Sequence, residues 1–259
     1  MGLPSGTLWA TCDIDITKSN GFCETPFTYE KSFFSWGNID GHNPNSVSTF
    51  DYNWGTTNNQ APLYEGQVYG NTPGCTLNGN IPVNENFDAA RANLGAPWRM
   101  PTTNEYMELF NNILYINADG TEVDTTKADK RVTVNGIVGL YLESKINGAR
   151  LFFSCSGAGN SSSWDYRGSW GNYWSSTFNS DITARQLFFS SNEVSTNAVD
   201  YRLFGYAVRA VLNSVSLKVS KVALTGDYND LINKPVISGG GTVVQSNWNE
   251  TDTSSPAYI

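Results

Sequence analysis

The spacing of apolar residues changes along this 259-residue chain, and that change constrains the fold most. Between residues 85 and 114, apolar side chains recur every three or four positions, which is typical of helices packed on one side. After residue 130 they occur in short runs rich in branched and aromatic residues, which is typical of strands. This order predicts an α+β domain in which two helices are segregated from a mostly antiparallel sheet.

The helical pattern divides into two segments. The first is expected at 85–94, with Asn84 or Asn86 in the N-cap position, where a short polar side chain accepts unpaired backbone N–H groups. The second is expected at 103–114, because its apolar positions continue at helical spacing as far as Ile113.

Turn-forming residues separate the later apolar runs into strands. Asn147-Gly148 lies between two such runs, and this dipeptide is a strong signal for a β-hairpin. The expected strands after residue 130 cover 131–134, 137–145, 149–154, 172–176, 184–190 and 205–212. Residues 37–82 show neither the helical nor the strand spacing of apolar residues, but they contain several aromatic residues. We therefore expect an ordered, packed loop region there.

Charge and hydropathy exclude two classes of partner. The formal net charge is −8 and no stripe of Lys and Arg occurs, so binding to nucleic acid is not expected. No apolar run reaches the roughly 18 residues of a membrane-spanning helix, and the N-terminal residues lack the pattern of a signal peptide. We therefore expect no membrane insertion and synthesis in the cytoplasm of the producing cell.

Residues suited to metal binding or catalysis are sparse. The cysteines Cys12, Cys23, Cys75 and Cys155 form no C-x-x-C motif, and His42 is the single histidine. Reduced thiols are the expected state, with a Cys12–Cys23 disulfide as the alternative. The acidic residues between 117 and 129 lack an ordered pattern of calcium ligands. We expect no metal, no cofactor and no enzymatic activity.

The last 46 residues differ from the rest of the chain. Residues 1–213 have the aromatic content of a globular domain, whereas residues 214–259 contain a Gly239-Gly240-Gly241 linker and are too few to bury much core on their own. We therefore expect a ligand-binding domain at 1–213 and a linker or oligomerisation segment at 214–259.

Several motifs within residues 1–212 occur together in a recognisable order. They are Gly2-Leu3-Pro4-Ser5-Gly6-Thr7-Leu8-Trp9-Ala10-Thr11, Trp98-Arg99-Met100-Pro101-Thr102-Thr103-Asn104-Glu105-Tyr106, Tyr173-Trp174-Ser175-Ser176-Thr177 and Gly205-Tyr206-Ala207-Val208-Arg209. In this order they resemble the major paralogous domain of Bacteroidetes and Fibrobacter proteins. That family is similar in fold to C-type lectins and to formylglycine-generating enzyme. The resemblance implies a C-type lectin-like domain in which Trp9, Trp98, Arg99, Trp174 and Arg209 are structural.

The tail resembles a different class of sequence. The stretch Leu224-Thr225-Gly226-Asp227-Tyr228-Asn229-Asp230-Leu231-Ile232-Asn233-Lys234-Pro235 is similar to the spacer repeat of phage tail-fibre proteins, and residues 244–259 are similar to a second such repeat. Such segments imply a homotrimeric virion fibre that contacts other virion proteins. Together the two resemblances imply a phage fibre whose lectin-like head binds a glycan or protein on the bacterial surface. The alternative is a structural or decorative virion protein, in the head or a tail fibre, whose lectin-like domain packs against other subunits.

The binding face is expected between residues 160 and 206. In related phage proteins, a diversity-generating retroelement varies this part of the domain. Trp164 and Trp170 argue against full variation here, because Trp cannot arise from Asn codons by adenine-directed change. Aromatic side chains interleaved with polar ones are also typical of adaptable binding surfaces. The candidate ligand-binding residues are Ser163, Trp164, Asp165, Tyr166, Arg167, Trp170, Asn172, Asn179, Asp181, Arg185, Phe188, Tyr201, Leu203, Phe204 and Tyr206. The alternative is that some of the aromatic residues, Phe204 and Tyr206 above all, belong to the core.

Overall fold

The computed structural model describes residues 1–43, 79–160, 163–180 and 182–213. Residue contacts divide the chain into two compact units, Met1–Leu217 and Lys218–Ile259, and all described residues belong to the first. These residues form mostly β-sheet with two helices, so the predicted α+β class is confirmed. The domain boundary predicted after residue 213 stays a prediction, as does most of the loop region expected at 37–82, because residues 44–78 lie outside the described part.

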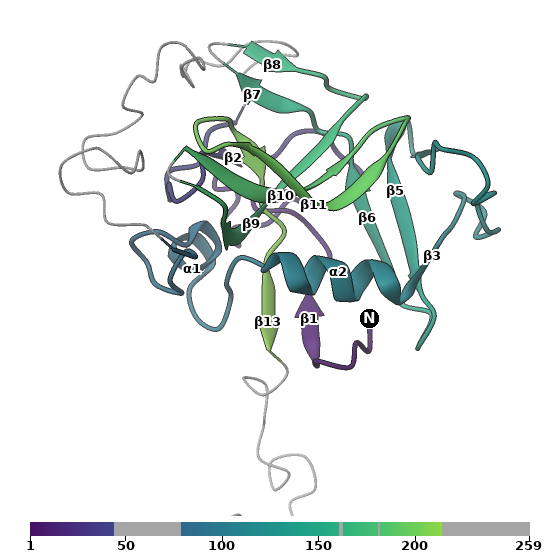
Figure 1. Ribbon diagram of the computed structural model, residues 1–259, viewed down its shortest axis with the longest axis horizontal. Coiled ribbons are helices and arrows are strands. Elements are labelled where there is room, and N and C mark those ends of the chain that lie inside the picture. Colours follow the sequence, from purple (N-terminus) through teal and green to yellow (C-terminus); the bar gives the residue numbers. More distant parts are fainter. Residues whose placement is uncertain (44–78, 161–162, 181, 214–259) are drawn as a thin grey trace, which may run out of the picture. The chain divides into compact units, whose positions relative to one another are not determined.

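A five-stranded sheet forms the centre of the domain (Figure 1). Its strand order is β11, β10, β9, β12 and β2, and only the contact between β12 and β9 is parallel. The bounds are β11 (Val194–Tyr201), β10 (Thr183–Phe189), β9 (Gly171–Phe178), β12 (Tyr206–Ala207) and β2 (Phe33–Phe34).

A second sheet is built around one long strand, β5 (Ile137–Ser144). Its antiparallel partners are β3 (Ile113–Tyr115), β4 (Val132–Val134) and β6 (Arg150–Ser154). The predicted hairpin through Asn147-Gly148 is confirmed as the connection between β5 and β6. Gly148 adopts a φ of +71°, which a residue without a Cβ atom reaches at little cost.

Two short antiparallel pairs complete the described unit. One consists of β7 (Ala158–Asn160) and β8 (Ser163–Asp165). The other consists of β1 (Thr7–Trp9) and β13 (Val211–Asn213). In the second pair, Thr7 lies opposite Asn213, so the first and last strands of the described unit are neighbours (Figure 1).

Helix α1 (Ala89–Leu94) is shorter at its N-terminus than predicted. The N-cap is Asp88, whose Oδ1 accepts hydrogen bonds from the amides of Ala90 (2.9 Å) and Arg91 (3.0 Å). The proposed cap Asn84 instead accepts the amides of Asn86 and Phe87 and closes a preceding turn. Both residue types satisfy free amides, so the sequence pattern alone could not separate the turn from the helix.

Helix α2 (Thr103–Asn111) begins where predicted and ends early. Thr102 and Glu105 form a reciprocal capping box at its N-terminus, and Glu105 also makes an ion pair with Arg99. Ile113 was expected on the last helical turn, but it is the first residue of β3 and pairs with Ser144. Strand pairing at a buried β-branched residue here overrides the helical spacing.

The strand prediction also missed β11 and the short strands β7 and β8, and it merged two others. Strand β11 was not predicted, because its sequence Val-Ser-Thr-Asn-Ala-Val-Asp-Tyr is largely polar. The single strand expected at 205–212 is instead divided between β12 and β13, which lie in different sheets.

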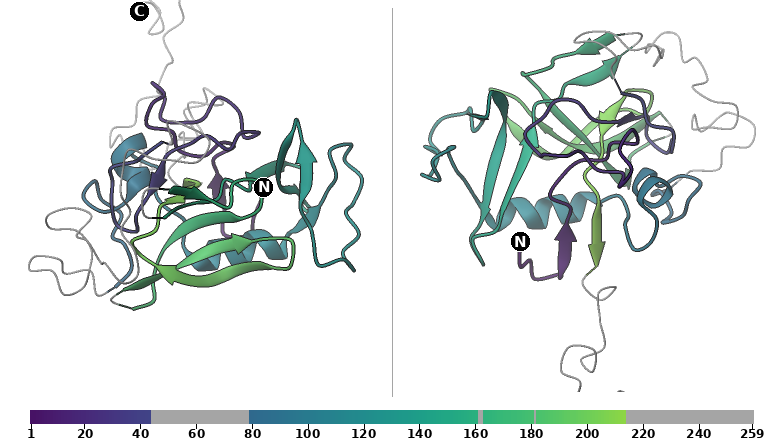
Figure 2. Two further views of the ribbon diagram at one scale, coloured as in Figure 1. Left: turned by 90° about the horizontal axis from the view of Figure 1, so that it is seen from above. Right: turned by 180° about the vertical axis from the view of Figure 1, so that it is seen from behind.

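The five-stranded sheet separates two apolar clusters. On one face, Tyr173 and Leu187 pack with Tyr106 and Leu109 of α2. On the other face, Trp174 packs in a cluster that includes Ala89 and Ala90 of α1. Figures 1 and 2 show α2 lying across its face of the sheet, while α1 lies to the side. Adjacent residues of β9 therefore supply opposite halves of the core, as the two-residue period of a strand requires.

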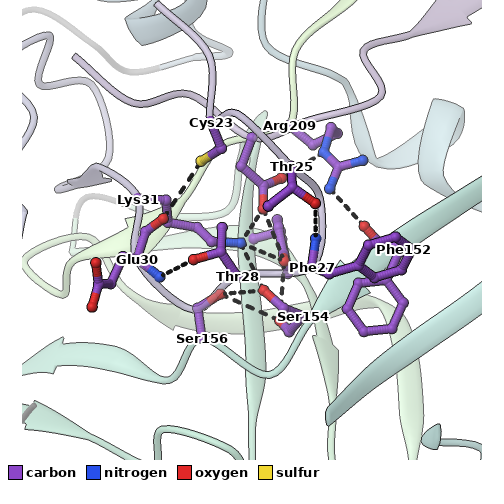
Figure 3. A network of polar contacts seen from close by, with 12 residues as sticks. Cys23, Thr25, Phe27, Thr28, Glu30, Lys31, Phe152, Ser154, Ser156 and Arg209 are labelled. Carbon is purple, nitrogen blue, oxygen red and sulfur yellow. Dashed lines mark hydrogen bonds and ion pairs between the residues drawn. The ribbon is translucent and has the colours of Figure 1, made fainter. Parts of the chain in front are cut away.

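Three charged side chains are buried at the centre of this domain (Figure 3). Asp13 accepts hydrogen bonds from Lys31 Nζ at Oδ2 and from Arg209 Nε at Oδ1 (2.5 Å). Lys31 also donates to Ser154 Oγ (2.7 Å), while the remaining nitrogens of Arg209 donate to backbone carbonyls, including that of Phe152 (2.7 Å). The structural role expected for Arg209 is confirmed, and we call Asp13, Lys31 and Arg209 the buried charge cluster.

The two cations determine the protonation state of Asp13. Burial alone would raise the pKa of this carboxyl group, but Arg209 and Lys31 lower it below its usual value. Burial would likewise lower the pKa of Lys31, whereas Asp13 raises it. All three groups therefore stay charged at neutral pH, and removing one leaves the others buried without compensation.

Replacing Asp13 by Asn is expected to destabilise the domain by about 3–5 kcal/mol, because two cations then share a buried site with no anion. The measurement is the free energy of unfolding in urea. Glu193→Gln, which removes an exposed negative charge, is the matched control and should leave stability unchanged. If Asp13→Asn lowers the free energy of unfolding no more than the control does, Asp13 is not needed to compensate the two buried cations.

The stabilising effect of Asp13 is expected to depend on pH in the acid range. Because the folded-state pKa is lowered, the stabilisation is fully present above the unfolded-state pKa of about 4 and is lost as pH falls further. The difference in unfolding free energy between wild type and Asp13→Asn should therefore be constant from about pH 5 to 8 and shrink below about pH 4. A difference that grows on acidification would show that folding raises the pKa of Asp13 instead of lowering it.

Candidate functional site

The candidate site is a group of three aromatic side chains that we call the aromatic shelf: Tyr166, Trp170 and Phe188. The rings of Tyr166 and Trp170 are stacked, with centroids 3.6 Å apart and planes inclined by 9°. Phe188 of β10 meets Trp170 edge-on at 5.4 Å. Tyr166 is 50% exposed, so the shelf presents an aromatic ring to solvent although its base is packed.

The shelf is carried by a tight turn between β8 and β9. The carbonyl of Tyr166 accepts the amides of Ser169 (2.9 Å) and Trp170 (3.0 Å), and the amide of Gly168 bonds to the carbonyl of Cys155 (2.8 Å). Tyr166 itself adopts a φ of +59°. A bulky residue rarely occupies this left-handed region, so the turn holds the ring in a strained backbone conformation.

Gly157 allows this turn to pack closely against the sheet. Its φ is +80°, and a Cβ atom at this position would lie 2.1 Å from the Asp165 carbonyl oxygen and 2.8 Å from the Arg167 amide nitrogen. Its own amide donates to the carbonyl of Trp170 (2.8 Å). The start of the turn packs closely against Gly157 and its end accepts a hydrogen bond from the Gly157 amide. A larger residue at this position would collide with the turn.

Arg167 points to a different pair of rings from those of the shelf. Its guanidinium lies 4.7 Å from the ring of Trp164 and 5.2 Å from that of Tyr29, distances that favour cation–π attraction. Trp164 is buried, packs against Phe33 and donates its indole N–H to the carbonyl of Ser156.

A polar cluster lies on the same sheet face as Phe188. Tyr206 donates its hydroxyl to Asp200 Oδ2 (2.6 Å), and the side-chain amide of Gln186 is 3.4 Å from the same oxygen. Burial raises the pKa of Asp200, while hydrogen bonds from Tyr206 and from the Tyr201 amide act in the opposite direction. Burial also raises the pKa of Tyr206, and Asp200 and Tyr166 raise it further.

Four candidate residues are buried rather than surface-facing: Trp164, Asn172, Leu203 and Tyr206. Packed side chains offer little area to a partner, so burial does not favour their expected contact with a ligand, which stays a prediction. The core alternative for Tyr206 is the better description of its ring, which packs at 4.4 Å on Trp174. Asp181 lies outside the described residues.

The remaining candidates are partly accessible but do not form one surface. Residues 184 and 186 of β10 face the polar cluster, so strand alternation places Arg185 on the opposite face, where it bonds to Asn197 (2.8 Å). Tyr201 and Phe204 make an edge-on pair at 6.0 Å, and Phe204 reaches Tyr206 at 6.1 Å. Ser163 and Asp165 bond to each other beside the turn, whereas Asn179 bonds to Thr183.

Sequence reasoning missed Gln186 and Asp200. Asp200 lies on β11, the strand that the apolar pattern did not reveal. Gln186 lies on a predicted strand, but its polar side chain gave no sign that it would be 2% exposed. An alternation rule applied across residues 194–201 is the signal that would have placed Asp200 on a defined face.

The cysteines and acidic residues show no metal-binding group in the described part of the chain. Cys12, Cys23 and Cys155 are free thiols, so the alternative Cys12–Cys23 disulfide is absent. Burial raises the pKa of Cys23 and of Cys155 to about 12, which keeps both protonated and poorly nucleophilic at neutral pH. Among these residues no group of three or more His, Cys, Asp or Glu side chains is placed to hold a metal ion.

The structure also offers two hollows away from the shelf. One of about 270 Å³ is lined by polar side chains including Asp15, Glu24 and Thr28. The other, of about 210 Å³, lies beside Phe22 and Trp98.

No described helix is long and apolar enough to cross a membrane. Comparisons with protein-family models, with curated proteins and with solved structures gave no match.

Replacing Gly157 by Ala is expected to displace the Tyr166 turn, because the added methyl group overlaps the Asp165 carbonyl. Gly148→Ala is the matched control, since Gly148 also has a positive φ but a Cβ atom there meets nothing within 4 Å. Gly157→Ala should lower the free energy of unfolding by about 1–3 kcal/mol more than the control does. Equal losses, measured in urea, would show that the turn does not depend on this close contact.

Proposed function

We propose that this protein is a binding module, not an enzyme, that attaches to a glycan or protein on a bacterial surface through the aromatic shelf. The observation that carries the proposal is Tyr166, a half-exposed aromatic residue held at a φ of +59° by a turn that fits closely onto Gly157. Strained, rigid and exposed groups are typical of sites where a ligand is contacted.

Folding alone gives no reason for a tyrosine at this position. A left-handed backbone costs about 1–2 kcal/mol for a residue with a Cβ atom, and glycine or asparagine would form the turn at lower cost. Stacking on Trp170 returns about 0.5–1.5 kcal/mol, which roughly cancels the strain. The exposed ring face therefore contributes little to stability, but it offers contact area that is already ordered before binding.

The surroundings of the shelf suit a ligand with both apolar and polar faces. An exposed aromatic face packs against the C–H groups of a sugar ring or against an apolar protein side chain. Gln186 lies two residues before Phe188 on the same face of β10 and bonds to Asp200, and Arg167 follows Tyr166 in the same turn. Such a small contact area supports weak attachment by a single site.

The wider proposal rests on the sequence resemblances. We propose a C-type lectin-like domain at the head of a homotrimeric phage fibre, located in the virion together with other virion proteins and diversified by a retroelement around the shelf. Three heads on one fibre would engage a cell surface together, and the resulting avidity compensates for weak single sites.

Tyr166→Gly is expected to reduce attachment while leaving the fold intact. It removes the ring and the backbone strain together, so the two effects on stability, each about 1 kcal/mol, oppose one another. The measurement is binding of labelled protein to a panel of Bacteroidetes cells, and we expect strain-selective binding to fall by about tenfold or more.

The matched control is Ile146→Ala, because Ile146 is a similarly exposed apolar residue (49%) in the turn between β5 and β6. Binding that survives Tyr166→Gly would show that the shelf is not the site. Binding of the wild-type trimer to no strain would favour the structural or decorative role instead.

A further inference from the structure

The hollow of about 270 Å³ has a buried carboxylate in its wall, and we call it the Asp15 hollow. Asp15 is 5% exposed. Its Oδ1 accepts three hydrogen bonds, from the Thr17 amide (3.0 Å), the Thr17 hydroxyl (2.7 Å) and Asn43 Nδ2 (2.8 Å). Its Oδ2 accepts none from the described residues, yet it is not among the polar atoms that the protein encloses completely. Since Asp15 lines the hollow, Oδ2 is the oxygen free to meet a ligand there.

The local turn does not explain why this carboxylate is buried. Asp119 and Asp124 make the same two hydrogen bonds to a threonine two residues further along the chain, Thr121 and Thr126 respectively. Both of those aspartates are exposed. The turn therefore forms with its carboxylate in water, and the desolvation of Asp15 is a cost that turn formation does not require.

The charges around the Asp15 hollow are mostly negative. Glu24, Glu30 and Lys18 also line it, and Lys18 is already paired with Glu24 (2.8 Å). Within the described ranges, no Lys, Arg or His nitrogen forms an ion pair with Asp15. A carboxylate withdrawn from water without a counter-charge favours a cationic ligand over a neutral one.

Another part of the wall is held in place by its own hydrogen bonds. The hydroxyls of Thr25 and Thr28 each accept the backbone amide two residues further along (3.2 and 3.1 Å; Figure 3). Cys23 donates its thiol to the carbonyl of Glu30 (3.5 Å), and the next residue, Lys31, belongs to the buried charge cluster. A ligand would therefore meet a wall that is ordered before binding, which lowers the entropic cost of association.

The arrangement of acceptors indicates which cation fits. Within the described residues, no group of three or more His, Cys, Asp or Glu side chains is placed to hold a metal ion. A guanidinium group typically binds both oxygens of a carboxylate, but Asp15 Oδ1 is already taken by three donors. An ammonium group is compact and needs only the open oxygen, Oδ2.

The size and lining of the hollow indicate what carries the ammonium group. Among the described residues no aromatic side chain lines it, so a sugar ring would lack the flat apolar partner on which such rings pack. At about 270 Å³ it is also smaller than the roughly 300–1,000 Å³ of pockets for drug-sized ligands. These properties suit the end of a single alkyl side chain.

We propose that the Asp15 hollow binds the ammonium group of a lysine side chain presented by a protein partner. Asp15 Oδ2 is the acceptor, and Glu30 adds negative charge beside it. No lining residue belongs to the aromatic shelf, so the hollow is a second contact site whose test is independent of the shelf.

The test uses the full chain and a single lysine side chain without charged ends, Nα-acetyl-lysine methylamide. In amide NMR spectra of labelled protein, this compound should shift the signals of Thr17 and Cys23 saturably, with a Kd of about 1–10 mM. The same compound acetylated at Nε should bind about tenfold or more weakly, because it has lost the charge. The corresponding arginine compound should bind about threefold or more weakly.

Two variants of the same turn separate local recognition from net charge. Asp15→Asn keeps an acceptor for Thr17 but replaces the charged pair of oxygens by an amide, so lysine binding should weaken about tenfold or more. Asp119→Asn removes the same charge from the same kind of turn away from the hollow and should leave binding unchanged. Equal losses in both variants would overturn the proposal, since long-range attraction would then explain the binding.

Urea unfolding of Asp15→Asn supplies a readout that a structural role would not share. Removing a buried carboxylate without a counter-charge should leave the free energy of unfolding unchanged or raise it, while lysine binding weakens. Lower stability with unchanged affinity would overturn the proposal and assign Asp15 to the fold alone.

Glu30→Gln tests the hollow without disturbing a buried group, because Glu30 is exposed. It should weaken lysine binding about twofold or more, whereas Glu193→Gln, which removes an exposed charge outside the hollow, should not. Equal affinities of these two variants would overturn the contribution of Glu30 and, if Asp15→Asn does not fold, the proposal itself.

The remaining outcomes identify other ligands and would each overturn the proposal. Equal binding of the Nε-acetylated compound would replace the ammonium group by neutral donors. Calcium chloride that shifts the same signals and displaces the lysine compound would identify a metal ion. Tighter binding of glucosamine than of the lysine compound would identify a sugar.

Discussion

The ion pairs of Asp13 with Lys31 and Arg209 connect parts of the chain that no single sheet brings together. Arg209 lies just before β13 and donates to carbonyls of residues 10 and 11 and of Phe152 in β6. Lys31 lies just before β2 and reaches Ser154 at the end of β6. The chain between β1 and β2 contains no strand longer than an isolated bridge. Side-chain charges therefore add long-range order to a few separate backbone hydrogen bonds, such as those from Ala10 to Ala210 and from Ser32 to Ile14.

This cluster and the candidate site share a structural support. Ser154, which accepts from Lys31, also exchanges a hydrogen bond with Ser156 (2.9 Å). The carbonyl of Ser156 accepts the indole N–H of Trp164, and Gly157 lies under the turn that bears Tyr166. The turn is thus held by residues 154–157, which directly follow the buried part of β6. A ring presented from such a base loses little conformational entropy when it contacts a partner.

Local signals in the sequence were sufficient for some elements and insufficient for others. Thr102, Glu105 and Asn147-Gly148 act through their immediate neighbours, so α2 and the β5–β6 hairpin could be predicted. The end of α2 depended on the pairing of Ile113 with Ser144, which lies far away in the sequence. The residues of the aromatic shelf were among the predicted ones. The burial of Trp164 and Leu203 and the position of Asp200 could not be predicted, because they depend on contacts between residues far apart in the sequence. Composition selects residue types for a binding face, whereas strand alternation and packing decide which of them reach the surface.

The pairing of β1 with β13 has a consequence for how this domain is attached to other polypeptide. Thr7 and Asn213 are paired, so the first and last strands of the described unit lie side by side. In Figure 1 this pair lies at the opposite end of the unit from β8, which leads into the Tyr166 turn. Neighbouring ends of this kind allow a domain to be joined to another polypeptide, or inserted into one of its loops, at a single place.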